Sequence, residues 1–322
     1  MQSRQETADA RAERLQAVLD KLETGVTELF ESDRFTAYLQ TMSKFHQYSM
    51  NNVLLIAMQC PAASRVAGFH AWKKDFGRTV RRGETGIKIL APCPVKMLLE
   101  QETVDPTTQQ PILDNAGNPV KETAVIRRPR FKVVTVFDVS QTEGKELPAL
   151  GVSELTGEVE RFEPLSNALR ELSPVPVAYR EMPGLAKGCY DQMEQAVFLR
   201  PGMSETQTLK TLIHEIAHAK LHALPVENGV VAALPEKDRR TREVEAESVA
   251  YVVCQHFGVD TSDYSFGYVA GWSKGKELPE LKASLACIRT TAAELIDGME
   301  SRCPALAPAR PQPAKRRQEL QR

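Results

Sequence analysis

The stretch from Ser204 to His222 constrains the fold of this chain more than any other. Ser204 is a good helix N-cap, and Gln207 stands at the capping-box position three residues later. Apolar residues then recur every three or four positions, the spacing of one buried helix face. They are Leu209, Leu212, Ile213, Ile216, Ala217 and Leu221. We therefore predict a helix that is buried along most of its length.

Two histidines lie on this predicted helix. His214 and His218 are four residues apart, so their side chains project from one face, one turn apart. Two imidazoles at this spacing can bind one metal ion, and Glu215 beside them can take a proton from a water at that ion. The pattern is typical of a zinc hydrolase in which glutamate is the general base. The alternative is a chance match on a core helix, and a third ligand distinguishes the two interpretations.

Residues 239–253 form a second predicted helix, which carries three glutamates. Glu243 and Glu247 are four residues apart and share a face, whereas Glu245 is rotated by about 200° from Glu243 and is expected to face elsewhere. We predict that Glu243 is the third metal ligand and that Glu247 is the acceptor that orients a ligand imidazole. The alternative interpretation of these glutamates is a solvated acidic helix face.

Other residues of metal-binding type are predicted to be structural. His222 lies one turn beyond His218, too far to share a tetrahedral ion, and His256 is near the end of the second helix. The cysteines form no CxxC pair, which fits reduced thiols rather than a disulfide framework or a zinc site. They are Cys60, Cys93, Cys189, Cys254, Cys287 and Cys303.

Composition sets only outer limits. The 322 residues are enough for two domains, and 42% hydrophobic residues are enough for ordinary cores. Lysine and arginine (41) nearly balance aspartate and glutamate (42), so the net charge says nothing about nucleic acid. No apolar run has the length of a membrane span, and the first thirty residues lack a signal-peptide core. We expect a globular cytoplasmic protein without a membrane partner.

The first half of the chain is expected to be a separate module. Apolar residues at helical spacing predict three leading helices, the first over residues 6–31. Strands are predicted at residues 87–90 and 131–139 from their β-branched runs. Residues 101–122 between these strands are polar and rich in turn signals, so we predict a surface excursion there.

Residues 66–92 of this module interleave aromatic and basic side chains, a pattern typical of single-stranded nucleic-acid binding. Aromatic rings would stack on bases, and cations would follow the phosphates. The predicted DNA-binding residues are Trp72, Lys73, Lys74, Arg78, Arg81, Arg82 and Lys88. The alternative is that the aromatic residues belong to a core and that the basic run is a solvated edge.

The second half is expected to follow a linker at residues 143–164, which lacks firm periodicity. Residues 188–199 predict a hairpin, and residues 196–200 are our candidate for the strand edge that aligns a peptide substrate by main-chain pairing. The sequence after Cys303 is rich in proline and alanine and then basic, so residues 301–322 are predicted to be a disordered tail.

Several segments resemble one known family. YSMNNVLLI (48–56), VAGFHAW (66–72) and GETGIKILAP (83–92) resemble the N-terminal domain of ArdC-type antirestriction proteins. That domain is associated with single-stranded DNA binding, so the resemblance implies the same partner here. HEIAH (214–218) and REVEAE (242–247) are similar to the zincin-type metallopeptidase domain that follows it and to the ImmA/IrrE peptidases.

We therefore predict an α+β protein with two domains. An N-terminal domain of mixed helix and sheet (6–142) would bind single-stranded DNA, and a zincin-like metallopeptidase domain (165–300) would follow the linker. The setting implied is antirestriction or another role on a mobile element. The expected partners are single-stranded DNA and a protein or peptide substrate.

In the predicted mechanism, His214, His218 and Glu243 hold one Zn²⁺, with Mn²⁺ as another candidate, and Glu215 activates water for attack on a peptide carbonyl. Two alternatives stay open. The protein could be a regulatory peptidase that cleaves a repressor, or a non-enzymatic DNA-binding antirestriction factor whose metal site is structural.

Overall fold

The structure of the chain is a computed structural model. It describes residues 8–30, 32–103, 110, 119, 121–147, 161–227, 230–231, 237–261, 266 and 269–304. Most of the predicted linker, tail and surface excursion therefore lies outside the described residues. The α+β class predicted from the sequence is confirmed.

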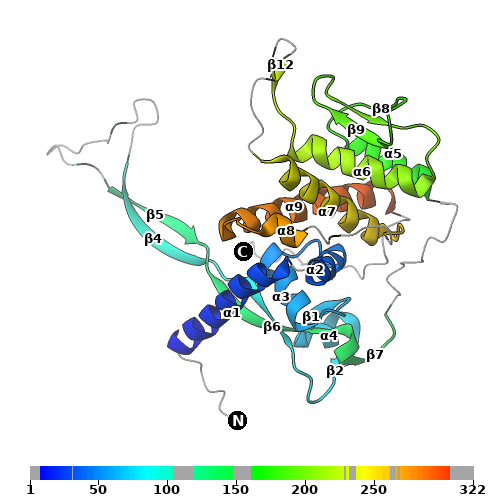
Figure 1. The fold of residues 1–322 in the computed structure, drawn as a ribbon. Coiled ribbons are helices and arrows are strands. Elements are labelled where there is room, and N and C mark those ends of the chain that lie inside the picture. The colour runs from blue at the N-terminus through cyan, green and yellow to red at the C-terminus, as the bar shows by residue number, and fades with distance from the viewer. Residues whose placement is uncertain are drawn as a thin grey trace. The chain divides into compact units, whose positions relative to one another are not determined.

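The first half begins with helices and continues with short strands (Figure 1). The helices are α1 (Ala8–Leu29), α2 (Ser32–Lys44), α3 (Met50–Gln59), α4 (Phe69–Phe76) and the 3-10 turn η1 (Val139–Gln141). The strands are β1 (Val66–Gly68), β2 (Arg78–Val80), β3 (Ile87–Pro92), β4 (Val95–Glu102), β5 (Lys121–Arg128), β6 (Phe131–Asp138) and β7 (Thr142–Gly144).

The second half is mainly helical. Its helices are α5 (Phe162–Leu172), α6 (Glu205–Leu221), α7 (Arg239–Phe257), α8 (Val269–Ser273) and α9 (Leu278–Arg302). Its strands are β8 (Val177–Tyr179), β9 (Gly188–Asp191), β10 (Ala196–Leu199), β11 (Val226–Glu227) and β12 (Val230–Val231).

The described residues form two compact units. One contains the chain up to Asp20 together with Lys88–Val134, and the other contains Lys21–Ile87 together with the chain from Thr135 onward. In the first unit, β4 and β5 pair as an antiparallel ribbon in which Val95 lies opposite Arg128. The second unit contains both helices predicted to form the site.

Short sheets complete the strand pairing. β6 lies between β1 and β3, and it runs antiparallel to β1 with Val66 opposite Asp138. β10 lies between β8 and β9, parallel to β8 and antiparallel to β9. β2 pairs with β7, and β11 pairs with β12.

α7 is the central helix of the second unit. It packs against α6, α9 and α2, while the other side of α6 packs on β9 and β10 (Figure 1). Because α7 has neighbours on several sides, its apolar residues are not confined to one stripe. Those that are fully buried include Val244, Ala246, Val249, Ala250, Val252 and Val253.

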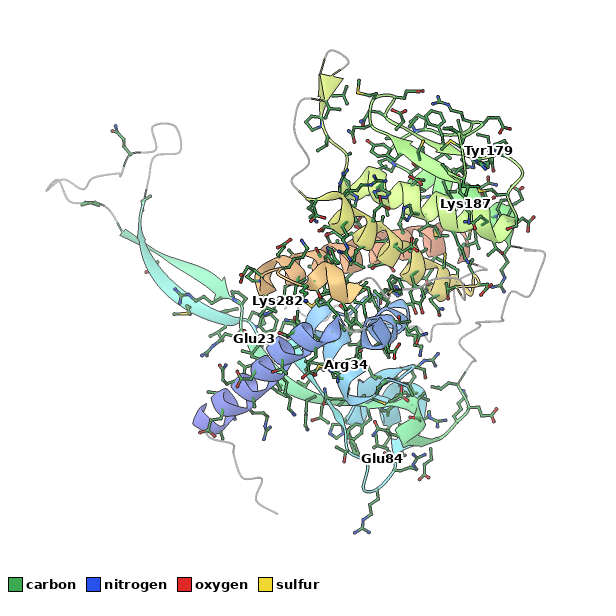
Figure 2. The ribbon with its side chains drawn as sticks, in the orientation of Figure 1. Glu23, Arg34, Glu84, Tyr179, Lys187 and Lys282 are labelled. Atoms are coloured by element: carbon green, nitrogen blue, oxygen red, sulfur yellow. The ribbon has the colours of Figure 1, made fainter. Side chains whose placement is uncertain are left out.

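Aromatic side chains from distant parts of the sequence close the core of this unit. The rings of Phe30 and Trp272 lie 5.4 Å apart, as do those of Phe35 and Phe266, both in edge-on geometry. At the surface, Lys282 on α9 lies 3.9 Å from Glu23 on α1 (Figure 2). This exposed ion pair contributes little to stability, whereas the buried aromatic contacts hold the ends of α1 and α2 against residues that follow α7.

Among the described helices, none combines the length and the apolar character that a membrane crossing requires.

Candidate functional site

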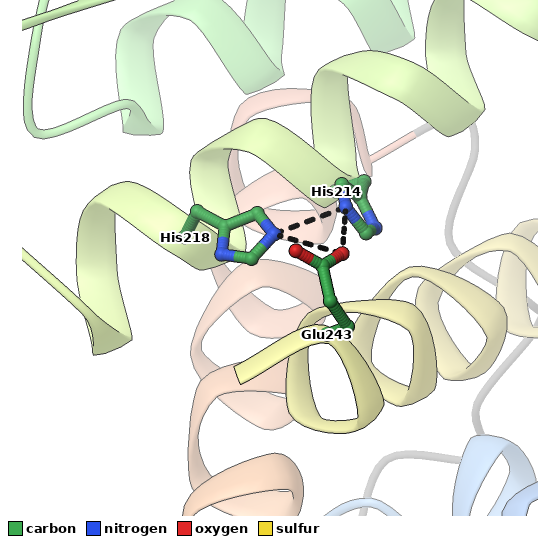
Figure 3. Close-up of side chains that lie close together, drawn as sticks. All are labelled: His214, His218 and Glu243. Atoms are coloured by element: carbon green, nitrogen blue, oxygen red, sulfur yellow. Dashed lines mark hydrogen bonds and ion pairs between the residues drawn. The ribbon is translucent and has the colours of Figure 1, made fainter. Parts of the chain in front are cut away.

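α6 and α7 bring the three predicted metal ligands together. His214 and His218 project from one face of α6 toward Glu243, which lies near the start of α7 (Figure 3). The Nε2 atoms of the two histidines are 3.1 Å apart. Each Nε2 atom is 3.6 Å from Oε2 of Glu243.

These separations fit a shared metal ion. In a tetrahedral zinc site with bonds of about 2.1 Å, the ligand atoms lie about 3.4 Å from one another. Two imidazoles and one carboxylate are also a donor set that binds zinc while leaving a fourth position for water or substrate. The geometry agrees with the predicted ligand set, which stays a prediction until metal binding is measured.

The carboxylate of Glu215 lies beside the ligands in a buried position. It is 7% exposed, and its Oε2 accepts a hydrogen bond of 2.7 Å from the backbone N–H of Tyr190 on β9. Burial raises the pKa of Glu215, although the neighbouring His214 acts in the opposite direction. A fixed carboxylate with a raised pKa is a competent proton acceptor.

A cleft of about 370 Å³ opens at this carboxylate. Its wall includes His214, Glu215 and Glu247 from the two site helices, and Lys187 and Gly188 from the segment leading into β9. Lys187 is labelled in Figure 2, and its Nζ donates a hydrogen bond to the side chain of Gln207. The cleft therefore adjoins the side of the site that carries Glu215.

Glu247 lies where a carboxylate that orients a ligand is expected. Its Oε2 is 3.3 Å from Nδ1 of His214, on the side of the ring opposite Nε2. When this ring is neutral, a hydrogen bond donated from Nδ1 leaves the Nε2 lone pair directed toward Glu243 and His218. The predicted role of Glu247 therefore agrees with its position.

The electrostatics of the site favour a cation among these groups. Burial lowers the pKa of His214, but the carboxylates of Glu243 and Glu247 outweigh it and raise the value to about 10. Burial also lowers the pKa of His218, and the nearby His214 lowers it further. Two charged imidazoles 3.1 Å apart would repel each other, so at most one of the two carries a positive charge. The neighbouring imidazoles of His214 and His218, each 3.6 Å from its carboxylate, hold the pKa of Glu243 far below its ordinary value.

Two residues near the site were missed by sequence reasoning. Glu245 faces away from the three ligands, as predicted, but it meets His222, whose Nδ1 is 3.0 Å from Nδ1 of His218. His222 lies outside the predicted ligand set, but it contacts His218, a member of that set. The signal in the sequence is the spacing of four residues between His222 and His218, which places the two rings one turn apart on the helix.

The prediction that residues 196–200 form an edge strand that aligns a peptide substrate is wrong. β10 is the central strand of its sheet, and both its edges are already paired with β8 and β9. A strand with two partners has no free edge to offer a substrate. β9 lies at the edge of this sheet, packs on α6 and holds Glu215 through Tyr190.

The predicted DNA-binding residues divide into buried, bonded and exposed groups. Trp72 is fully buried and its Nε1 donates to the carbonyl oxygen of Phe137, so the prediction that its ring stacks on a base is wrong. The Arg78 guanidinium donates to Thr142 and to the backbone of β7, including the Gly144 carbonyl. Arg81 is exposed and pairs with Glu84.

Besides Arg81, four more of the predicted cations are exposed. Lys73 and Lys74 lie on α4, Arg82 lies in the turn after β2, and Lys88 lies on β3. An aromatic ring also remains available on α4, because Phe69 is 52% exposed. The sequence pattern could not separate Trp72 from Phe69, since both fall in the same aromatic and basic run.

Comparison with known proteins identifies two domains in the chain. Residues 8–137 match the N-terminal domain of anti-restriction factor ArdC, and residues 181–254 match an IrrE N-terminal-like domain of the M78 peptidase class. The chain thus carries an ArdC-type N-terminal domain followed by an IrrE-like domain, the two domains that the sequence resemblance predicted. Both site helices begin within the IrrE-like match.

The relatives include larger proteins. An uncharacterized Bacillus anthracis protein, pXO2-81, is 30% identical over 313 residues, which cover 90% of this chain and 52% of that protein. The DNA primase TraC of Escherichia coli is 28% identical over 204 residues, which cover 62% of this chain and 18% of the primase. The chain thus spans about half, or less, of the length of these relatives.

Solved structures of the antirestriction ArdC protein from plasmid R388, metal-free and Mn(II)-bound, are 18% and 17% identical to this chain. They match with TM-scores of 0.44 and 0.42, and the matches cover 80% and 79% of this chain and 86% and 84% of theirs.

Proposed function

We propose that this ArdC-type protein binds single-stranded DNA and carries a peptidase site that depends on a divalent metal. One observation carries the peptidase part. His214, His218 and Glu243 place three ligand atoms within 3.1 to 3.6 Å of one another. Glu215 lies next to them with its carboxylate fixed by Tyr190.

The donor set indicates which metal the site would hold. Two imidazole nitrogens and one carboxylate oxygen suit Zn²⁺, and Mn²⁺ is compatible with the same groups. When bound, the metal supplies a Lewis acid that polarises a carbonyl and lowers the pKa of water. Zn²⁺ is our first choice because a site with three protein ligands and an open position is typical of catalytic zinc.

The residues of the chain supply the proton transfers. Glu215 would take a proton from the attacking water and then deliver it to the leaving amine. The hydrogen bond from Tyr190 holds one carboxylate oxygen in place, and burial keeps the group basic. A peptide substrate would lie along the edge of β9 and reach Glu215 through the adjoining cleft.

Glu215→Gln tests the peptidase proposal. The substitution removes the proton acceptor but keeps the shape of the side chain, so cleavage of a peptide library should fall by about 10²- to 10⁴-fold. Zn²⁺ uptake by the variant should be unchanged, because Glu215 is not among the ligands. Glu181→Gln, at an exposed carboxylate outside the site, is the matched control.

Cleavage by Glu215→Gln at the wild-type rate would contradict this role. The two alternative functions give different results. A structural metal site predicts that antirestriction activity survives the substitution, whereas a repressor-cleaving peptidase predicts that DNA binding by the N-terminal region contributes nothing.

The family supports the DNA-binding part of the proposal, and exposed side chains provide candidates for it. Lys73, Lys74 and Phe69 offer two cations and a ring on one short helix. In the other unit, the exposed Phe131 is flanked by Arg130 and Lys132 at the start of β6. Both sets combine stacking with phosphate attraction, which is the combination that single strands require.

The double variant Lys73→Glu and Lys74→Glu tests the first set. Binding to a labelled single-stranded oligonucleotide should weaken, and the slope of log affinity against log salt should fall by about 0.7 for each phosphate that the variant no longer neutralises. Lys274→Glu, an exposed lysine in the second half of the chain, should leave both quantities unchanged. Equal weakening by the control would contradict a local role for α4.

A further inference from the structure

A hydrogen-bonded series of polar side chains runs behind His218, on the side away from the proposed metal. Nζ of Lys237 lies 2.7 and 2.9 Å from the two carboxylate oxygens of Glu245. Oε2 of Glu245 lies 2.9 Å from Nε2 of His222. Nδ1 of His222 lies 3.0 Å from Nδ1 of His218. The four residues come from α6, α7 and the segment that leads into α7.

The side chains of this series are buried to different degrees. Glu245 is fully buried and His222 is 8% exposed, so neither is satisfied by bulk water. Lys237, at the outer end, is about one third exposed. A fully buried carboxylate is stable only when charged or hydrogen-bonded partners surround it, and Glu245 has Lys237, His222 and the buried hydroxyl of Ser284 as partners.

Hydrogen-bond chemistry fixes which group donates and which accepts at each step of this series of side chains. The lysine ammonium can only donate, so Glu245 accepts from it as a carboxylate. Glu245 also needs a donor at His222, which places a hydrogen on Nε2 of that ring. In a neutral imidazole the other nitrogen is then an acceptor, so Nδ1 of His222 accepts a hydrogen bond from Nδ1–H of His218.

The same order of donors and acceptors continues through His218 to the site. With its hydrogen on Nδ1, a neutral His218 has its lone pair on Nε2. That nitrogen lies 3.1 Å from Nε2 of His214 and 3.6 Å from Glu243. His214 is backed in the same sense by the carboxylate of Glu247, 3.3 Å from its Nδ1. Each ligand histidine therefore has an acceptor behind it, but the one behind His218 is buried.

We propose that Glu245 and His222 are positioning residues, which hold His218 in the tautomer with hydrogen on Nδ1 and keep its Nε2 directed at a divalent metal. This inference rests on the proposed metal site for its function. The tautomer itself is a property of the metal-free chain and can be measured without any metal. The arrangement extends the common pairing of a ligand imidazole with a carboxylate by one further histidine.

Two substitutions at one position separate positioning from simple packing. His222→Gln keeps an acceptor for His218 and a donor for Glu245, because a carboxamide has both groups. His222→Leu fills similar space with neither group. Glutamine should therefore rescue the property that leucine loses, which a purely space-filling role does not predict.

The experiment uses the full-length chain labelled with ¹⁵N histidine. Long-range ¹H–¹⁵N spectra of the metal-free protein report the tautomer of each ring, and the His218 signals are assigned by their loss in His218→Ala. Wild type and His222→Gln should show hydrogen on Nδ1 of His218, and His222→Leu should lose that preference. Zn²⁺ affinity, measured by competition with a coloured chelator, should fall about 10- to 100-fold in His222→Leu and only a few-fold in His222→Gln.

The spectrum of the wild-type chain is decisive even if His222→Leu does not fold. Hydrogen on Nε2 of His218 in the wild type would overturn the proposal, as would wild-type Zn²⁺ affinity in a folded His222→Leu variant. Failure of the proposed metal site would give a different result from failure of the positioning role. A wild-type chain that takes up no Zn²⁺ contradicts the metal site itself, whereas tight uptake with hydrogen on Nε2 contradicts only the positioning role.

Discussion

The absence of a side chain at Gly188 is as important to the site as its ligands. A Cβ atom at this position would lie 2.5 Å from Cγ2 of Thr211, 3.0 Å from the carbonyl oxygen of Phe198 and 3.2 Å from Cγ of Glu215. Only glycine lets β9 approach α6 this closely. The close approach brings the Tyr190 N–H within reach of Glu215.

We predict that Gly188→Ala impairs the site without removing a ligand. The added methyl group must displace β9 or Glu215, so peptide cleavage should fall about 10-fold or more and stability should fall by about 1 to 3 kcal/mol. Peptide hydrolysis and urea unfolding measure the two effects. Gly68→Ala is the control, because no atom lies within 4 Å of its added Cβ. Full activity of Gly188→Ala would contradict the account of β9.

At this scale, sequence spacing predicted which side chains share a helix face, but not what lies across from them. Four-residue spacing brought His214 and His218 together, and it separated Glu243 from Glu245. The contact between Glu245 and His222 depends on how α6 and α7 cross, which no local pattern encodes. Trp72 was misassigned for the same reason, since an aromatic residue in a basic run can point into the core or out of it.

At the scale of the elements, the N-terminus of α7 is capped by the side chain of Asp238. Asp238 accepts hydrogen bonds from the backbone N–H of Thr241 at 2.9 Å and from its hydroxyl at 2.7 Å. These hydrogen bonds, with help from Lys276, lower the pKa of Asp238 to about 2. Because Glu243 lies in the first turns of α7, the cap also fixes the helix end that carries the third predicted ligand.

We predict that Asp238→Ala lowers the free energy of unfolding by about 1 kcal/mol near neutral pH. The folded pKa lies below the ordinary value of 3.8, so the stabilisation is fully present above about pH 4 and is lost as pH falls toward 2. The difference between wild type and variant should therefore shrink between pH 5 and pH 3. Urea unfolding at several pH values measures it.

Ser204→Ala provides a matched control for this pH dependence. Ser204 caps α6 by accepting from the N–H of Gln207, and its hydroxyl does not titrate in this range. The loss of stability caused by Ser204→Ala should be constant from pH 5 to pH 3. A loss at Asp238→Ala that is equally constant would contradict the role of its charged carboxylate.

Helix bounds followed from the sequence more closely than strand order did. Among the described residues, α1 (Ala8–Leu29) lies within the predicted first helix (6–31), because periodic apolar residues are local signals. Strand order is set by contacts between distant residues. The hairpin of β9 and β10 was predicted, but the parallel pairing of β8 on the far side of β10 was not.

At the scale of the whole molecule, residues from the first and second halves of the sequence share one core within the second unit. Within the second unit, α2 packs against α7, and Phe30 and Phe35 contact aromatic residues that follow α7 in sequence. His256 on α7 also bonds to the Ser43 carbonyl at 2.7 Å and to Glu300 at 2.9 Å. The sequence predicted apolar helix faces in the first half, but it did not predict that one of them packs against α7. The domain limits 6–142, 143–164 and 165–300 accordingly remain a proposal.

Uptake of one divalent ion per chain by His214, His218 and Glu243 is the measurement on which the account depends most directly. Zn²⁺ titration calorimetry of the wild type should give one site, and His218→Ala and Glu243→Ala should each abolish it. Glu247→Ala should keep the stoichiometry and bind about 10- to 100-fold more weakly, because Glu247 contacts a ligand rather than the ion. Retention of the ion by Glu243→Ala, with its loss in Glu247→Ala, would contradict the account.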